Sequence, residues 1–131
     1  MHTQISNLIL AANFGIMLFF TVAVAPTIFM VLPQEWAAKY VRAFFPKYYA
    51  FLGVTTAISA MLADTLAFRL ALAGCAFFFF LSLLWITPTV NRARDAGREQ
   101  VFKTLHTLSV VINILQLAIF LFILYAGFVR S

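Results

Sequence analysis

Four long apolar segments, separated by short charged stretches, constrain the fold of this chain more than any other feature. Soluble domains average about 25% charged residues, whereas this chain of 131 residues has 10% charged and 64% hydrophobic residues. A helix needs about 20 apolar residues to cross the hydrocarbon core of a bilayer. We therefore predict one all-α domain over residues 1–131, an integral membrane four-helix bundle with spans at about 5–32, 47–67, 70–87 and 102–128.

The segment 34–45 has a different pattern from the four spans. Aromatic residues such as Trp36 and Tyr40 share one helical face, while Glu35, Lys39 and Arg42 share another. This pattern is typical of a short helix lying in the membrane interface. We predict such an interfacial helix between the first and second spans.

Three prolines are assigned structural roles at helix ends. Pro26 is expected to loosen the last turn of the first span, because proline lacks the N–H that continues the helical ladder. Pro46 is expected to end the interfacial helix and open the second span, and Pro88 to stop the third span. Asp64 or Thr65 is expected to cap the start of the third helix.

Small and polar residues inside the spans predict contacts between helices. Gly53, Ala57 and Ala60 form a narrow face on which a second helix can approach closely. Asn7 and Asn13 are each expected to hydrogen-bond to another helix, and the single cysteine, Cys75, has no intramolecular disulfide partner.

The positive charges predict the orientation of the bundle. Seven basic residues fall on the side of the first and third loops, and the other side has only Arg69 and Arg130; the seven are Lys39, Arg42, Lys47, Arg92, Arg94, Arg98 and Lys103. The positive-inside rule then places both termini outside and loops 1 and 3 in the cytoplasm. The net charge of +5 is explained by topology and by contact with anionic membrane lipids. We expect no nucleic-acid partner, since no basic face with interleaved aromatics lies on a soluble element.

A polar stripe on the fourth span is the candidate functional site. His106, Ser109, Asn113 and Gln116 follow a helical spacing that puts them along one side. The topology places Tyr48, Asn91, Arg94 and Asp95 at a similar depth, toward the cytoplasmic end. Since unpartnered polar groups are costly in a bilayer, the stripe is expected to face a groove, a neighbouring subunit or an interhelical hydrogen-bond ladder.

No cofactor is predicted, but haem b or copper is kept as an alternative. His106 can ligate through its imidazole, with Met30 at a similar depth as a second ligand. His2 is expected on the opposite side of the membrane and is excluded as a partner of His106. No nucleophile and base spacing is present, so an enzyme is the weaker interpretation.

Short motifs along the whole chain carry a family resemblance. They are Ala25-Pro26, Phe45-Pro46 with Tyr48 and Tyr49, Pro88 with Asn91, Arg94 and Asp95, and Phe102 with Leu105-His106 and Ser109. Together they resemble a small bacterial family of unknown function that shares its domain with the human transmembrane protein 205. The resemblance implies a four-helix protein of the bacterial inner membrane. A more distant topological likeness to the copper-resistance D and HemJ groups keeps haem or copper in view.

The leading functional prediction is a non-catalytic accessory or scaffold subunit, or a homo-oligomer, acting through helix–helix contacts with other membrane subunits. The first alternative is a haem- or metal-binding redox protein with a cytoplasmic-side pocket around His106. The second alternative is transport of a small solute by an oligomer.

Overall fold

The computed structural model describes residues 1–130, which form four long helices joined by short loops. The first helix consists of α1 (His2–Phe19), η1 (Phe20–Val24) and α2 (Ala25–Val31), and the second is α3 (Gln34–Leu62). The third consists of α4 (Leu66–Leu81), η2 (Ser82–Ile86) and α5 (Thr87–Asp95), and the fourth is α6 (Glu99–Arg130). The prediction of an all-α fold with four helices is confirmed.

Three of the four helices are long and apolar enough to cross a membrane: His2–Val31, Leu66–Asp95 and Glu99–Val129. A helix of 30 residues is roughly 45 Å long, which exceeds the hydrocarbon thickness of about 30 Å. The helix α3 is not among them. Its first half contains Glu35, Lys39, Arg42 and Lys47, so only the part from Tyr48 onward is continuously apolar.

The prediction that Pro46 separates an interfacial helix, 34–45, from a second span, 47–67, is wrong. Pro46 lies inside one helix of 29 residues, α3. A proline removes a single N–H donor, and a helix tolerates this loss where local adjustments satisfy the freed carbonyl. The helix α3 then ends at Leu62 and not near residue 67. Thr65 caps the next helix by accepting a 3.1 Å hydrogen bond from the Phe68 backbone N–H, as the sequence predicts.

The prediction that Pro88 stops the third span near residue 87 is also wrong, since the helix continues to Asp95. Pro26 and Pro88 each lie two residues after the end of a π-helical turn, η1 and η2 respectively. A proline ring clashes with the carbonyl four residues earlier, and a wider turn moves that carbonyl aside. In the second turn, the Thr89 hydroxyl donates to the Trp85 carbonyl at 2.6 Å. Each π turn therefore allows its helix to continue beyond the proline.

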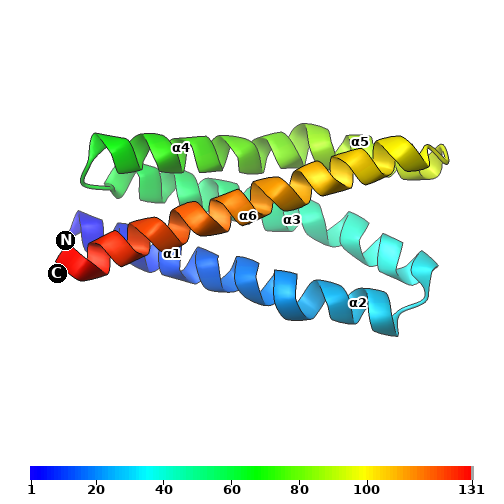
Figure 1. Cartoon of the computed structure of the whole chain (residues 1–131), viewed down its shortest axis with the longest axis horizontal. Helices are drawn as coiled ribbons and strands as arrows, with labels where there is room; N and C mark the ends of the chain where they lie inside the picture. Colours follow the sequence, from blue (N-terminus) through cyan, green and yellow to red (C-terminus); the bar gives the residue numbers. More distant parts are fainter. Residues whose placement is uncertain (131) are drawn as a thin grey trace.

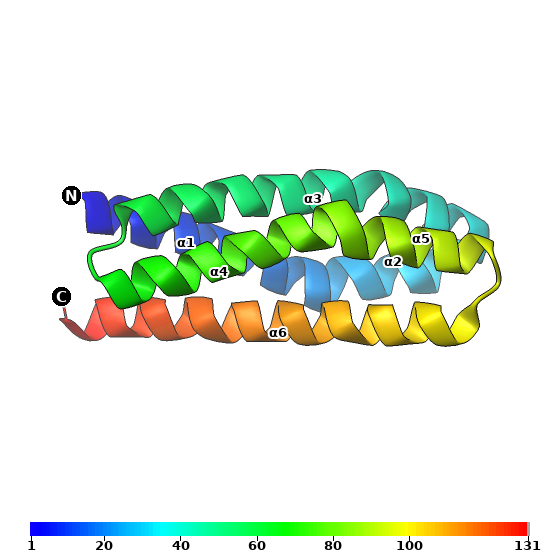
Figure 2. The same cartoon turned by 90° about the horizontal axis from the view of Figure 1, so that it is seen from above.

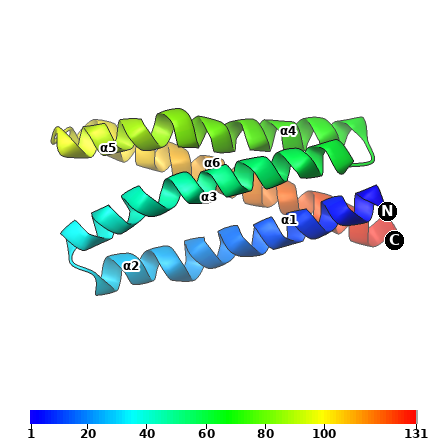
Figure 3. The same cartoon turned by 180° about the vertical axis from the view of Figure 1, so that it is seen from behind.

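The four helices form two hairpins that lie against each other (Figure 1). The first hairpin is α1–η1–α2 with α3, and the second is α4–η2–α5 with α6. The two termini lie at the same end as the loop between α3 and α4 (Figure 1). Seen from above, α6 runs along the whole length of the bundle (Figure 2). At the end with the other two loops, the hairpins spread apart (Figure 3), and no Cα atom of α2 lies within 8 Å of a Cα atom of α6 among the described residues.

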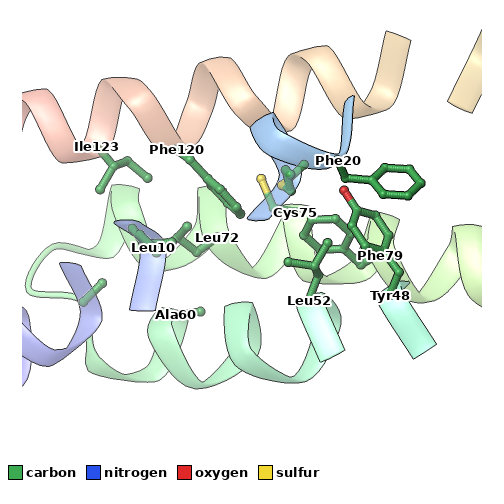
Figure 4. Packing of buried hydrophobic residues seen from close by; sticks show 12 residues of the cluster. Leu10, Phe20, Tyr48, Leu52, Ala60, Leu72, Cys75, Phe79, Phe120 and Ile123 are labelled. Carbon is green, nitrogen blue, oxygen red and sulfur yellow. The ribbon is translucent and has the colours of Figure 1, made fainter. Parts of the chain in front are cut away.

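The core lies in the half of the bundle nearer the termini. Its fully buried side chains include Leu10, Leu52, Leu72, Phe79 and Phe120. Phe120 points from α6 into this cluster, and Phe20 and Tyr48 lie beside each other at the end of the cluster toward the open hairpin ends (Figure 4). The core therefore closes one half of the bundle and leaves the other half open.

Small residues allow a close approach between α3 and α4. Gly53 lies under the ring of Phe80, and a Cβ atom at this position would come within 2.9 Å of the ring. Ala60 is buried on the same helix, whereas Ala57 is only half-buried. The close contact predicted for this face thus depends mainly on Gly53.

Buried polar side chains join α1 to α3. Asn13 donates through its amide to the hydroxyls of Thr55, at 2.9 Å, and Thr56, at 3.1 Å. Ser6 and Ser59 donate to each other's backbone carbonyls at 2.9 and 3.1 Å. The prediction that Asn13 bonds to another helix is confirmed.

Candidate functional site

A cavity of about 610 Å³ lies between the two hairpins where they spread apart. Ligand pockets typically have volumes of about 300–1,000 Å³. All four helices contribute to its wall: Phe20, Thr21, Ala25, Pro26, Phe29, Val41, Phe45, Tyr48, Tyr49, Ile86, Thr87, Val90, Asn91, Arg94, Phe102, His106, Ser109, Val110, Asn113 and Ile114. The wall is mostly apolar, with a small number of polar groups, which is the usual composition of a small-molecule site.

The cavity opens sideways, between α2 and α6. Several of its lining residues on these two helices are exposed, notably Phe29 on α2 and Val110 and Ile114 on α6. Nearer the core the opening ends where the Asn113 amide donates to the Thr21 hydroxyl at 3.2 Å. The entrance is therefore a lateral slot along the side of the bundle.

Aromatic rings form the wall of the cavity nearest the core. Phe20 packs against Tyr48 with ring centroids 5.0 Å apart, and against Phe45 at 5.6 Å. Tyr48 packs in turn on Tyr49 at 5.3 Å. These contacts fix the position of Tyr48, whose hydroxyl is buried and has no hydrogen-bond partner among the described residues. Buried tyrosine hydroxyls usually find a partner, so this atom is unusual.

Arg94 differs from the other basic residues near the loops. The Nη1 atom of its guanidinium is buried and has no partner within the part of the chain that the structure describes. Its Cζ atom lies 4.8 Å from the centre of the Phe102 ring, which is a favourable position for a cation. The sequence interpretation of Arg94 as a cytoplasmic anchor is incomplete, because its guanidinium reaches into the cavity wall.

A second cavity of about 750 Å³ adjoins the first, and the two share Phe29, Arg94 and Phe102 as lining residues. Its remaining wall is nearer the 96–98 loop and includes the charged residues Arg98, Glu99 and Lys103. Arg94 and Phe102 therefore stand at the boundary between an apolar cavity and a charged one.

Asp95 belongs to a different interaction from the one predicted. The Arg42 guanidinium binds its carboxylate through two hydrogen bonds of 2.7 and 3.2 Å, which link α3 to α5. The hydrogen bond to Asp95 raises the pKa of Arg42. Their side chains are 40% and 60% exposed, so solvent screens the pair and its contribution to stability is small. Asp95 does not line the cavity and has no contact with His106 among the interactions described.

The polar stripe on α6 divides into two parts. His106, Ser109 and Asn113 line the cavity, and the His106 ring stacks on Phe102 with centroids 6.0 Å apart. Gln116 is buried in the core, where its amide donates to the Cys75 carbonyl of α4 at 3.0 Å. Tyr48, Asn91, Arg94 and Pro26 also line the cavity. The structure thus brings together most of the residues that the sequence placed at this depth.

Met30 is not brought to His106. It is 84% exposed and does not line the cavity in which His106 lies. The described residues contain no group of three or more histidine, cysteine, aspartate or glutamate side chains with metal-binding geometry. The His106 and Met30 pair is therefore not assembled as a two-ligand site within one chain.

Sequence reasoning missed several cavity residues, including Thr21, Phe20 and Val90. Phe20 and Thr21 lie in the π turn before Pro26, and Val90 lies two residues after Pro88, so nearness to a proline was their only sequence signal. Ser6 and Ser59 were missed as well, because serine gives no distinct signal inside an apolar helix.

The comparisons with known proteins give one match. The model of a family described as a domain of unknown function, DUF4149, matches residues 8–99, well over half of the chain. No curated protein and no solved structure matches it. Nothing in these comparisons links the chain to transmembrane protein 205 or to the copper-resistance D and HemJ groups, so those resemblances stay predictions. The matched segment contains Tyr48 and Arg94 but ends before the cavity residues of α6.

Proposed function

We propose that this chain, which belongs to the DUF4149 family of domains of unknown function, is an integral membrane protein that binds a small apolar or amphiphilic molecule taken from the bilayer. Three helices with the length and apolar character of membrane spans support its placement in a membrane. The single observation that carries the binding proposal is the lateral cavity between α2 and α6.

The position of the cavity favours a ligand that arrives through the lipid phase. The slot lies between two helices that are apolar on their outer surfaces, with Phe29, Val110 and Ile114 exposed at its rim. In a bilayer these rim residues face acyl chains, not water. A molecule dissolved in the membrane therefore reaches the cavity without crossing an aqueous gap.

Filling the cavity tests this proposal. Ser109→Trp places an indole among the lining residues of α6, and we expect at least a tenfold weaker retention of ligand, equivalent to about 1.4 kcal/mol. The measurement is native mass spectrometry of the full chain purified in mild detergent, which counts the small molecules that remain bound. Val111→Trp is the matched control, because Val111 is exposed on the same helix and does not line the cavity. Equal retention in the two variants would contradict the proposal.

A role as an accessory or scaffold subunit, or as a homo-oligomer, is the second candidate. The observation that favours it is the apolar surface of α6, on which Leu115, Leu121, Phe122 and Phe128 are exposed. Such a face is covered either by lipid or by another membrane helix. A protein that is monomeric in mild detergent, with no co-purifying subunit, counts against this role.

Haem or copper at His106 is a lesser proposal, supported by the position of His106 in the cavity wall and not by Met30. The test is an absorption spectrum of the purified protein. If the spectrum has no haem band that is lost in His106→Ala, haem binding is excluded.

Transport of a small solute needs an oligomer, because the described cavity lies at one end of the bundle only.

For localisation, we propose the bacterial inner membrane with loops 1 and 3 in the cytoplasm. Arg92 and Arg94 lie at the end of α5, Arg98 lies in the loop that follows, and Arg42 binds Asp95 beside them. The basic residues are thus at the end that holds these loops, as the positive-inside rule requires. In this orientation the cavity lies in the cytoplasmic half of the protein. Cysteine labelling of a loop residue from either side of the membrane, in a Cys75→Ala background, tests the orientation.

A further inference from the structure

We infer that the lateral cavity binds an anionic phospholipid, with the head-group phosphate at Arg94 and the acyl chains along the apolar wall. This inference rests on the proposed binding function and adds the chemical class of the ligand. It is carried by two residues that line one cavity, Arg94 and Tyr48, each of which has a buried polar atom without a partner among the described residues, Arg94 Nη1 and the Tyr48 hydroxyl.

Arg94 provides the charge at the site. It is the one permanently charged residue among the described residues that line the cavity, and neither aspartate nor glutamate is among them. A buried guanidinium donor without an acceptor is unfavourable, and a phosphate oxygen supplies a charge-assisted acceptor with the geometry that arginine prefers. An anion bound at the Arg94 guanidinium is therefore favoured.

The acidic residue nearest in sequence does not meet this need. The carboxylate of Asp95 is engaged by Arg42 through both of its oxygens. Arg98 and Lys103 add two positive charges to the neighbouring cavity, against the single negative charge of Glu99. The surroundings of Arg94 are therefore net positive, which disfavours a cationic ligand and favours an anionic one.

Tyr48 provides a second polar contact from α3. Its hydroxyl is held by the aromatic wall and is buried without a partner. A phospholipid has ester and phosphate oxygens at neighbouring depths, so its polar region offers acceptors to both Tyr48 and Arg94. A purely apolar molecule leaves both atoms unpartnered, and a free phosphate ion leaves the apolar wall uncovered.

The remaining wall matches an acyl chain. Phe45, Ile86, Val90 and Ile114 are apolar lining residues, and the slot between α2 and α6 lets a chain continue into the surrounding lipid. Arg94 is the penultimate residue of the Leu66–Asp95 helix, which is longer than the hydrocarbon core, so it lies at the depth of lipid head groups. The charge and the apolar wall are thus arranged in the same order as the parts of a phospholipid.

The test compares two lipids that have identical acyl chains. The full chain in mild detergent is mixed with equal amounts of palmitoyl-oleoyl phosphatidylglycerol and palmitoyl-oleoyl phosphatidylcholine, and bound lipid is counted by native mass spectrometry. We expect a preference of about tenfold for the anionic lipid, which Arg94→Gln abolishes and Arg94→Lys reduces only partly. The control is Arg92→Gln, which removes the same charge from the same helix at a residue that is exposed and outside the cavity lining. A helical circular dichroism spectrum confirms that each variant is folded.

Each alternative outcome has a distinct meaning. An equal loss of preference in Arg92→Gln and Arg94→Gln overturns the inference, because the effect is then one of general surface charge. Displacement of phosphatidylglycerol by inorganic phosphate alone overturns the assignment of an amphiphile in favour of a free anion. If Ser109→Trp expels both lipids while Arg94→Gln leaves their ratio unchanged, the cavity function stands and the head-group assignment fails. If the wild-type protein retains neither lipid, both fail.

Discussion

Replacing Gly53 with leucine is expected to destabilise the bundle by about 1–3 kcal/mol. Gly53 lies where α3 and α4 approach, and even a Cβ atom would come within 2.9 Å of the Phe80 ring. A leucine side chain occupies the volume that this ring now fills, so either the ring leaves its position or the two helices separate. Thermal unfolding in mild detergent, followed by circular dichroism, measures the loss.

The chain offers two matched controls for Gly53→Leu. A Cβ atom at Gly15 or Gly74 meets nothing within 4 Å, so Gly15→Leu and Gly74→Leu add the same side chain to an apolar helix without the Cβ clash found at Gly53. Both are expected to leave the unfolding midpoint nearly unchanged. A similar midpoint in all three variants would show that the contact between Gly53 and Phe80 does not limit helix packing.

Replacing Asn13 with leucine is expected to destabilise the protein by about 1–2 kcal/mol. Asn13 is 1% exposed and donates to two hydroxyls on α3, those of Thr55 and Thr56. Leucine has the same number and branching of side-chain heavy atoms, so the change removes the hydrogen bonds while keeping the shape of the side chain. The same thermal unfolding assay measures the effect.

A double-mutant cycle separates the hydrogen bonds of Asn13 from other effects. Thr56→Val removes one acceptor in an almost isosteric way, and we expect its effect to be smaller when Asn13 is already leucine. Thr55→Val is a useful comparison, because the Thr55 hydroxyl also donates to the Phe51 carbonyl at 2.7 Å within its own helix. Strict additivity between positions 13 and 56 would contradict a bond between them that contributes to stability.

The apolar periodicity predicted the number of helices correctly, and their continuity incorrectly. Pro46 and Pro88 both read as helix ends in the sequence, yet both lie within helices. The reason is that a proline removes only one donor, whereas a break would leave several backbone groups unpaired. The π turn before Pro88 accommodates its ring, and nothing in the sequence of Ser82–Ile86 announces such a turn.

The sequence predicted the level along the bundle at which the candidate site residues lie, but not the direction in which each side chain points. The topology placed Tyr48, Asn91, Arg94 and His106 at one level of the bundle, and all four line the cavity. Sequence alone gave no rotation for each helix about its axis, so Asp95 was assigned to the same site although it pairs with Arg42 on another face. Met30 was assigned by depth as well, and it points away from the cavity wall.

Long apolar runs and the distribution of basic residues determined the all-helical fold, the four helices and the end of the bundle that holds the positive charge. These properties follow from composition along the chain, because backbone groups in an apolar setting must be paired within each helix. Only the tertiary structure decided that the hairpins spread apart at one end and that Arg94 lines a cavity with a buried guanidinium nitrogen that has no partner among the described residues. Those features depend on helix rotation and on crossing geometry, which are set by contacts such as Gly53 on Phe80 and Phe20 on Tyr48.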